Sequence, residues 1–272
     1  MIVHVDDPSA AVVADYRRLN DQSARRALEG DRFFIAEGIV SVERAVDSGH
    51  SLRSVLVTPS KVARVRDRLP RLVDGDVPLF VMERDRITEL VGFDLHRGVV
   101  ASADRRPIMG VAELAASGVS RVAILEGLND AENVGVIARA ARALWVEALV
   151  LDPTCTDPYS RRTVRVSMGE VLHLPVARSA DWPGDLDVLH DAGFETWAMT
   201  PADDAVDLWD AVDGERTGRP DRLGILLGAE GPGLSPKAMA AASARVRIPI
   251  AEAVDSLNVG HAAAITFAAL SH

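Results

Sequence analysis

Cysteine and lysine are almost absent from this chain of 272 residues. Its single cysteine, Cys155, allows no intrachain disulfide and no cluster of thiolates around a metal. The seven histidines are scattered, with no pair at the spacing of metal ligands, so we expect no metal site. No apolar run approaches the roughly 18 residues of a membrane span, and the N-terminus lacks the pattern of a signal peptide. These absences predict a cytoplasmic protein without a membrane anchor.

Aromatic residues are also few, at 4%, but hydrophobic residues make up 48% of the chain, which is enough for a sizeable core. The net charge of −10 argues at first sight against a nucleic-acid partner, yet the charge is uneven. Residues 1–106 hold 17 basic and 17 acidic residues, whereas residues 107–272 hold 13 and 23. The first part is therefore neutral. Much of the acidic excess lies in residues 203–215, which we expect to be a solvated face.

Segments typical of strands and helices alternate along the chain. This alternation predicts layered α/β domains, and the continuous apolar strands of the second part predict a parallel sheet covered on both faces. A polar linker ends at Pro107 and divides the chain into domains at 1–104 and 107–272. The expected strands are 33–36, 54–57, 78–82, 99–101, 122–125, 148–151, 196–199, 223–227 and 246–250. The expected helices are 9–29 (one or two), 39–48, one that starts at 58–60, 133–144, 186–192, one from 236 and one after 258.

The first stretch that carries chemistry spans residues 125–142, where a strand ends, a polar loop follows and a helix starts at Asn133. Arg139 lies six residues further on, among alanines that leave room for close approach. In one interpretation this is a surface helix with a solvated Arg139. In the other, the helix presents a guanidinium to a cleft at the carboxyl end of a parallel sheet, where ligands of α/β proteins bind.

The second stretch spans residues 226–235 and has three glycines within six residues, Gly228, Gly231 and Gly233, around Glu230. Glycine allows the main chain to adopt unusual φ angles and to approach a ligand closely. No Gly-Lys-Ser/Thr follows, so this is not a phosphate loop. The dinucleotide fingerprint with its acidic partner is missing too, which disfavours a nucleotide-binding oxidoreductase.

The third stretch runs from Ile248 through Ser256, Leu257 and Asn258 into an alanine-rich helix. Ser256 or Asn258 is suited to cap that helix by accepting a hydrogen bond from its free N–H groups. A capped C-terminal helix is the simpler interpretation. The alternative is that these polar side chains belong to a site, because polar groups pressed between a strand and a helix are costly unless they are satisfied.

Together, in this order and spacing, the three stretches resemble the motifs of the SpoU (TrmH-like) family of RNA 2′-O-ribose methyltransferases, in the knotted SPOUT superfamily. Residues 133–141, 228–235 and 248–259 resemble its first, second and third motifs. The resemblance covers residues 107–272. Residues 20–103 resemble more loosely the small ribosomal-protein-like α/β RNA-binding domain that often precedes it, at positions 37–38 and 96–101.

The resemblance implies a trefoil-knotted parallel-sheet methyltransferase domain with S-adenosylmethionine as methyl donor and no metal. It implies a cofactor pocket made by Thr200, Gly228, Ile248, Leu257 and Asn258. It implies a catalytic set of Arg139, Glu230, Ser256, Asn258 and Asn133. A guanidinium stays protonated, so we expect Arg139 to bind a phosphate and to stabilise a developing alkoxide. We expect Glu230, Ser256 and Asn258 to orient Arg139 and the ribose, and Asn133 to hold the first loop.

The resemblance also implies partners. They are RNA, with ribosomal RNA favoured over transfer RNA, and a second copy of the chain, which forms a homodimer through the C-terminal domain and brings the arginine of one subunit near the cofactor of the other. We expect the apolar C-terminal helix at this interface, although it would alternatively pack only within its own subunit; its apolar residues are Val259, Ile265, Phe267 and Leu270. We expect RNA to contact the first domain and the basic group Arg161, Arg162 and Arg165.

Two positions depart from the family pattern. Ala251-Glu252-Ala253 stand where the family usually has a glycine soon after the Ile-Pro pair, and we expect Glu252 to narrow or charge the rim of the pocket. Gly260-His261 stand where the family usually has Ser-Val, and we expect His261 to be packed or at an interface. A non-catalytic RNA- or ribosome-binding protein with the same fold remains the alternative function.

Overall fold

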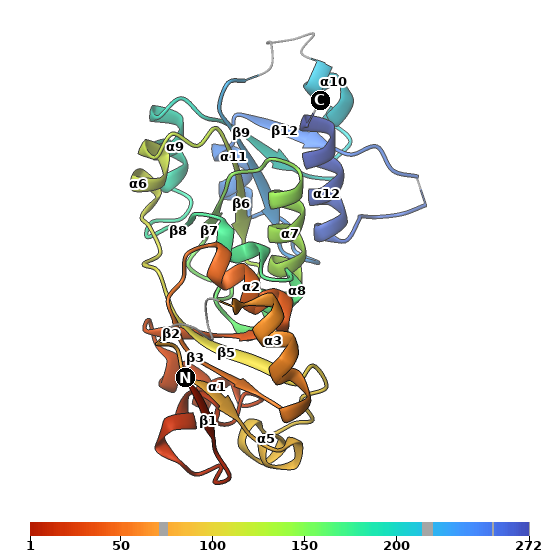
Figure 1. Cartoon of the computed structure of the whole chain (residues 1–272). Helices are drawn as coiled ribbons and strands as arrows, with labels where there is room; N and C mark the ends of the chain where they lie inside the picture. The colour runs from red at the N-terminus through yellow and green to blue at the C-terminus, as the bar shows by residue number, and fades with distance from the viewer. Residues whose placement is uncertain (71–75, 214–219, 252, 272) are drawn as a thin grey trace. The chain divides into compact units, whose positions relative to one another are not determined.

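The computed structural model describes residues 1–70, 76–213, 220–251 and 253–271. The chain forms two compact units (Figure 1). One comprises Met1–Pro107 together with Tyr159–His173, and the other comprises Ile108–Pro158 together with Leu174–His272. The chain therefore returns to the first unit once after entering the second. The linear bounds 1–104 and 107–272 remain a prediction about independent domains, and they do not anticipate this return.

The first unit is built on a five-stranded sheet in the order β1-β4-β3-β5-β2. Strand β1 pairs in parallel with β4 and β4 with β3, whereas β5 runs antiparallel to both β3 and β2. The expected strands are confirmed, and β1 is additional because three residues are too few to show an alternating pattern. The strands are β1 (Ile2–His4), β2 (Phe33–Glu37), β3 (Leu52–Val57), β4 (Leu79–Val81) and β5 (Val99–Asp104).

Helices cover both faces of this sheet (Figure 1). Helices α2 (Ile39–Asp47) and α3 (Val62–Arg68) pack against one face, and the short 3-10 turn η2 (Pro59–Lys61) comes directly before α3. The other face packs the 3-10 segment η1 (Ala11–Tyr16), α1 (Gln22–Glu29) and α5 (Arg84–Val91). Alternation along β2 explains the two layers: Phe33 and Ile35 join the core with Tyr16, while Phe34 lies on the other face against His50, at 5.2 Å between ring centroids.

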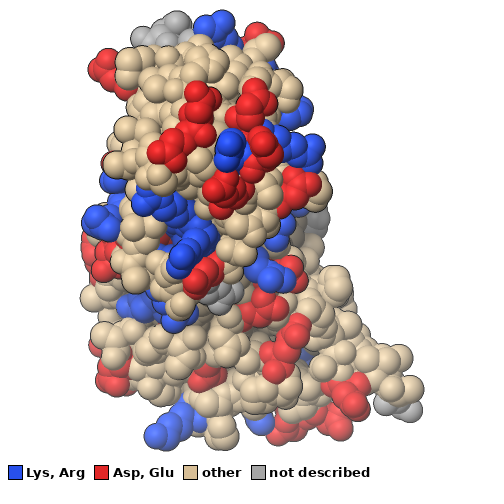
Figure 2. All heavy atoms as spheres, turned by 90° about the horizontal axis from the view of Figure 1, so that it is seen from below, with Lys and Arg blue, Asp and Glu red and all other residues tan. Residues whose placement is uncertain are grey.

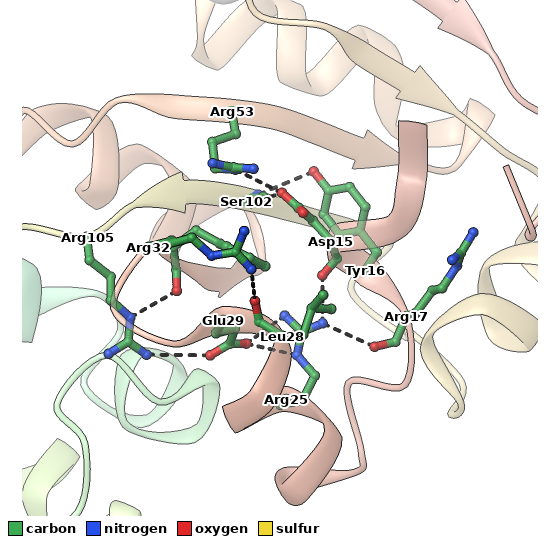
Figure 3. Close-up of polar contacts among 11 residues, drawn as sticks. Asp15, Tyr16, Arg17, Arg25, Leu28, Glu29, Arg32, Arg53, Ser102 and Arg105 are labelled. Atoms are coloured by element: carbon green, nitrogen blue, oxygen red, sulfur yellow. Dashed lines mark hydrogen bonds and ion pairs between the residues drawn. The ribbon is translucent and has the colours of Figure 1, made fainter. Parts of the chain in front are cut away.

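Polar contacts hold the segment 11–29 onto its face of the sheet (Figure 3). Within α1, the buried Arg25 donates to the buried Glu29 Oε1 from Nε at 2.8 Å and from Nη2 at 2.6 Å, and Glu29 Oε2 forms an ion pair with Arg105, which follows β5, at 3.5 Å. Asp15 Oδ2 accepts from Ser102 Oγ at 2.7 Å and from Arg53 Nε at 2.9 Å. Burial raises the pKa of Tyr16, which keeps its hydroxyl protonated for the hydrogen bond with Ser54. Removing Glu29 would be costly, because it would leave the charge of Arg25 buried without this partner.

The returning segment carries α8 (Arg161–Val166) and the 3-10 turn η3 (Glu170–His173), both part of the first unit. The Tyr159 ring packs against Phe34, with centroids 5.1 Å apart. Arg161 forms an ion pair with Glu37, and its guanidinium carbon lies 4.7 Å from the Phe93 ring centroid. Burial lowers the pKa of Arg161, although Glu37 opposes this. Arg161 is therefore paired within its own unit, and its expected contact with RNA remains a prediction.

The second unit contains a seven-stranded sheet in the order β10-β12-β9-β11-β6-β7-β8. All of its strand pairs are parallel, as predicted. The expected strand 246–250 ends at Arg247, so Ile248 and Ile250 lie beyond the sheet. The strands are β6 (Arg121–Glu126), β7 (Ala148–Leu151), β8 (Val176–Arg178), β9 (Glu195–Met199), β10 (Val206–Asp207), β11 (Leu223–Gly228) and β12 (Ala244–Arg247).

Helices α6 (Val111–Ala116), α9 (Asp185–Asp191) and α11 (Pro236–Ala241) share one hydrophobic core on one face of this sheet. Helices α7 (Ala131–Ala143), α10 (Leu208–Asp213) and α12 (Val259–Leu270) lie on the other face, with α12 packed along α7 (Figure 1). Helix α7 begins two residues before the expected Asn133, because the Asp130 side chain caps it by accepting from Glu132 N at 2.9 Å. Within the described part of the chain, no helix is long and apolar enough to cross a membrane.

Candidate cofactor and substrate site

A cavity of about 580 Å³ opens at the carboxyl ends of strands of the second unit. Its wall is formed by the segments that follow β9, β11 and β12 and by the start of α12. This is the position at which α/β sheets bind ligands. The residues predicted to bind a cofactor all line it, and their role as cofactor ligands remains a prediction. They are Thr200, Gly228, Ile248, Leu257 and Asn258.

The glycine loop, residues 228–235, supplies one wall of the cavity through residues 228–234. It folds back tightly: a Cβ added to Gly228 would lie 2.3 Å from both Gly233 C and Leu234 N. Gly233 N donates to Ala229 O at 2.9 Å and closes the turn. Gly231 and Gly233 have φ angles of 87° and 70°, which disfavour a side chain. A side chain at position 228 is therefore excluded by the loop itself, and the expected close approach of a ligand to this glycine remains a prediction.

Asn258 is the N-cap of α12, one of the two caps that the sequence allowed. Its Oδ1 accepts from Gly260 N at 3.0 Å and from His261 N at 3.3 Å. Because Oδ1 faces the helix, Nδ2 faces the other way, where it donates to Glu230 and, at 3.5 Å, to Asn133 Oδ1. One side chain of the third motif thus meets one from each of the other two motifs.

The remaining members of the catalytic set are placed differently. Ser256 is exposed and lines the cavity. Arg139 is exposed on α7, nearly two turns after Asn133, and does not line the cavity. Within the described residues, its guanidinium has no hydrogen bond or ion pair. One chain therefore gathers Asn133, Glu230, Ser256 and Asn258 but leaves Arg139 on the outer face of its helix.

Helix α12 packs within its own chain more than expected. Val259, Phe267 and Leu270 are buried in the unit, and Ile265 is half-buried. These three residues pack inside the subunit, and whether α12 also lies at a dimer interface remains a prediction. The exposed side of α12 carries His261 and Ala268 instead. His261 is therefore not packed in the core, and Glu252, expected at the cavity rim, lies outside the described residues.

The sequence patterns did not indicate several residues of this region. Met199 and Met239 line the cavity. Only Met199 could have been found from the sequence, because it is the last residue of an expected strand, at the edge of the sheet where ligands bind. Within the described residues, no three His, Cys, Asp or Glu side chains are grouped so as to hold a metal ion. Cys155 is buried, and burial raises the pKa of its thiol to about 12, so it is an inert core residue.

Comparison with known proteins decides the family. A sequence model of the SpoU rRNA Methylase family matches residues 120–268, more than half of the chain. The chain belongs to this family. An uncharacterized tRNA/rRNA methyltransferase of Mycobacterium tuberculosis is 41% identical over 264 residues, which cover 97% of this chain and 89% of that protein. Relatives of this similarity in both sequence and length place the chain among SpoU-type RNA methyltransferases.

Solved structures share the fold over nearly the whole chain. The AdoMet-bound rRNA methyltransferase from Sinorhizobium meliloti has a TM-score of 0.80 at 26% identity, covering 99% of this chain and 97% of that one. A solved RNA 2′-O ribose methyltransferase has a TM-score of 0.75 at 24% identity, covering 99% and 98%. The second likeness is one of fold alone.

Proposed function

We propose that this SpoU-family protein transfers a methyl group from S-adenosylmethionine to a ribose 2′-hydroxyl of structured RNA. The observation that carries the proposal is the hydrogen bonding of Asn258 to Glu230 and Asn133 at the cavity, which joins the three motif segments. Ribosomal RNA is the favoured substrate, because the S. meliloti neighbour is an rRNA methyltransferase. Transfer RNA, or RNA binding without catalysis, is the alternative.

The cavity suits S-adenosylmethionine in size and chemistry. About 580 Å³ is within the usual range for sites of small ligands. Apolar residues that line it, including Met199, Leu227, Ile248 and Leu257, offer a surface for an adenine ring. The three glycines of the glycine loop also line it, and they carry no side chain that would cover their main-chain groups. When bound, the cofactor supplies a methyl group already activated on a sulfonium.

The protein's part is to position and activate the ribose hydroxyl. Glu230 and Asn133 both accept from Nδ2 of Asn258, which directs its amide toward the other two motif segments. Arg139, which stays protonated, grips the RNA phosphate and stabilises negative charge on the 2′-oxygen. The only cysteine is buried in the core with its pKa raised, so the chain offers no thiolate nucleophile for methylating a base carbon.

We further propose that Arg139 serves the cavity of a second copy. It is exposed, lines no part of its own cavity, and shares its side of α7 with Val136, which is 41% exposed. The neighbouring exposed side of α12 carries His261 and Ala268. A two-fold dimer through this face uses one patch on both subunits and places each arginine on the partner. Under this arrangement the site is complete only in the assembly.

For RNA contact we propose a basic edge on the first unit, made by Lys61, Arg64 and Arg97. Most arginines of this unit are paired; Arg84, for example, donates to Asp94 at 2.9 Å. The three residues of the basic edge form no hydrogen bond or ion pair through their side chains with any described residue. On the face drawn in Figure 2, basic and acidic side chains are interspersed. A basic side chain beside an acidic one is already neutralised, so we expect a phosphate backbone to bind where the cations lack an acidic partner. Such contacts are sensitive to salt.

The knotted chain path is part of the same proposal. The last strand, β12, lies between β10 and β9 instead of being added at an end of the sheet. Beyond it the chain passes the segments after β9 and β11 that line the cavity, before entering α12. A crystal structure in which the C-terminal segment does not pass through a loop of the chain would contradict a trefoil knot.

Calorimetry with S-adenosylmethionine and a methylation assay test the proposed function. We expect saturable cofactor binding and incorporation of labelled methyl into total ribosomal RNA from cells that lack the protein, at a position resistant to alkaline cleavage. Binding without incorporation into ribosomal or transfer RNA supports the non-catalytic alternative. No binding of the cofactor refutes the proposal.

A further inference from the structure

Glu126 is a buried acidic residue at the carboxyl end of β6, beside β11 in the sheet of the second unit. It is 8% exposed and pairs in the strand ladder with Gly228, where the glycine loop begins. Among the described residues, no Lys, Arg or His forms an ion pair with it. A carboxylate in this position needs hydrogen-bond donors, because burying it without them is costly.

Each carboxyl oxygen of Glu126 accepts a hydrogen bond from a different segment. Trp182 Nε1 donates to Oε1 at 2.6 Å, and Ser235 N donates to Oε2 at 2.8 Å. The Trp182 segment is itself anchored, since Asp185 Oδ2 accepts from Ser179 Oγ at 2.7 Å and from Ala180 N at 2.9 Å. Glu126 thus connects the glycine loop to a second loop that is held independently.

Ser235 is the point at which the cavity wall becomes helix α11. The residues before it, 228–234, line the cavity. Its own Oγ caps α11 by accepting from Ala238 N at 3.2 Å. Gly231, Pro232 and Gly233 at the tip of the loop are exposed, so side-chain packing contributes little to the loop's shape there. The hydrogen bond from Ser235 N therefore fixes the end of the wall.

We propose that Glu126 is a positioning residue for the cofactor: through Ser235 it holds the glycine loop in the shape that forms the cavity wall, and Trp182 orients its carboxyl group. This inference rests on the proposed function, because it takes the cavity to be the S-adenosylmethionine site. Glu126 does not line the cavity, so it acts through the loop. The carboxylate is suited to this because it offers two acceptors and no donor.

Glu126→Gln is the informative variant. A glutamine has nearly the same shape but only one acceptor, so its amide N–H₂ opposes one of the two N–H groups. We expect calorimetry to show about tenfold weaker binding of S-adenosylmethionine, as for an unsatisfied buried donor. The KM for the cofactor should rise more than kcat falls. Without cofactor, amide hydrogen exchange in residues 229–235 should become faster than in the wild type.

Removing one donor should rescue the variant. In Glu126→Gln/Trp182→Phe the amide has only the Ser235 N–H to satisfy, so most of the lost cofactor affinity should return. Trp209→Phe is the matched control, because Trp209 is 51% exposed and distant in sequence from both loops. It should change neither affinity nor exchange. A double variant weaker than Glu126→Gln alone would contradict the proposal.

Several results would overturn the inference without touching the proposed function. One is a Glu126→Gln protein that binds the cofactor within about twofold of the wild type with unchanged loop exchange. If that variant does not fold, Trp182→Phe alone keeps the carboxylate and removes its orienting donor. We expect it to weaken cofactor binding about threefold and to speed exchange at Ser235, and unchanged values refute the inference. A wild type that fails to bind S-adenosylmethionine refutes the proposed function and this cofactor role together.

Discussion

The Asn258 side chain donates through Nδ2 to Glu230 while its Oδ1 caps helix α12. The cap fixes which way the amide faces, because the N–H groups at the start of the helix are donors and need an oxygen as acceptor. Glu230 therefore meets a donor, and a hydrogen bond joins the glycine loop to the start of the C-terminal helix. This contact links the second and third motifs of the family at the edge of the cavity.

Exchanging donor and acceptor tests this contact. In Asn258→Asp the cap survives, but a carboxylate faces Glu230, so we expect methyl transfer to fall roughly 10- to 100-fold through misplaced groups. In Asn258→Asp/Glu230→Gln the glutamine amide donates to the aspartate, and much of the activity should return. Single-turnover methylation rates measure both. A double variant as inactive as Asn258→Asp would show that the residues do not act as a pair.

Gly228→Ala should disrupt the cavity wall for steric reasons. The added Cβ would lie 2.3 Å from main-chain atoms of Gly233 and Leu234, which cannot rotate away. We expect about 1–3 kcal/mol lower stability, as for overpacking, and a loss of cofactor affinity measured by calorimetry. Gly110→Ala is the control, since its Cβ would meet nothing within 4 Å. Equal thermal shifts in the two variants would contradict the expectation.

Mixing two inactive variants tests whether Arg139 acts across a dimer. Arg139→Ala and Glu230→Ala should each be inactive alone. A mixed dimer has one site with an intact cavity and an intact arginine from the partner, so random mixing should restore about a quarter of wild-type activity for a two-fold dimer. The methylation assay after co-refolding or co-expression provides the measurement. If the arginine serves its own chain, every site in the mixture lacks one group and activity stays absent.

Neutralising the basic edge should weaken RNA binding in a salt-dependent manner. For Lys61→Ala/Arg64→Ala/Arg97→Ala we expect the slope of log affinity against log salt to fall by roughly 2 units, because up to three cationic side chains no longer bind phosphate. Fluorescence anisotropy with a labelled RNA hairpin measures it. Arg26→Ala is the control: Arg26 is exposed on α1, which packs on the opposite face of the sheet from α3.

An unchanged slope in the triple variant would place the RNA elsewhere. Competition by poly-glutamate as strong as competition by unlabelled RNA would point to an acidic protein partner instead. Neither result bears on cofactor binding, because the basic edge belongs to the first unit and the cavity to the second.

His50 should make the first unit sensitive to acid. Burial lowers its pKa from 6.5 to about 4, with repulsion from Arg106 and His173 adding to the effect. The unfolded chain binds the proton more readily than the folded chain, so the stability is present above about pH 6.5 and is lost as the pH falls toward 4. The loss should be on the order of 2–3 kcal/mol.

Replacement of His50 by phenylalanine keeps an aromatic ring beside Phe34 and Tyr159 but removes the titration. As the pH falls from 6.5 to 4, the unfolding free energy of the wild type should decrease by more than that of the variant. Denaturant unfolding across this range measures it. The exposed His96, replaced by glutamine, serves as the control, and a pH dependence that His50→Phe leaves unaltered would contradict the assignment.

Much of this protein could be read from residue types at short range. Continuous apolar strands separated by helices indicated the parallel sheet, because a strand covered on both faces carries no polar side. The three motifs were found because each lies within a few consecutive residues at the end of a strand or the start of a helix. Asn258 was a candidate cap for the same reason: capping depends on one residue and the turn that follows it.

Contacts between distant segments could not be read in this way. Glu126 accepts hydrogen bonds from Trp182 and Ser235, which lie 56 and 109 residues after it in the sequence. No local pattern distinguishes Glu126 from any other polar residue at the end of a strand. Residues 159–173 group with the first unit because Tyr159 and Arg161 pack on Phe34, Phe93 and Glu37. The order of the strands in the sheet and the side of each helix that faces the sheet determine which side chains come into contact. For that reason the motif residues Asn133, Glu230 and Asn258 converge, while Arg139, on the same helix as Asn133, is left on the outer face.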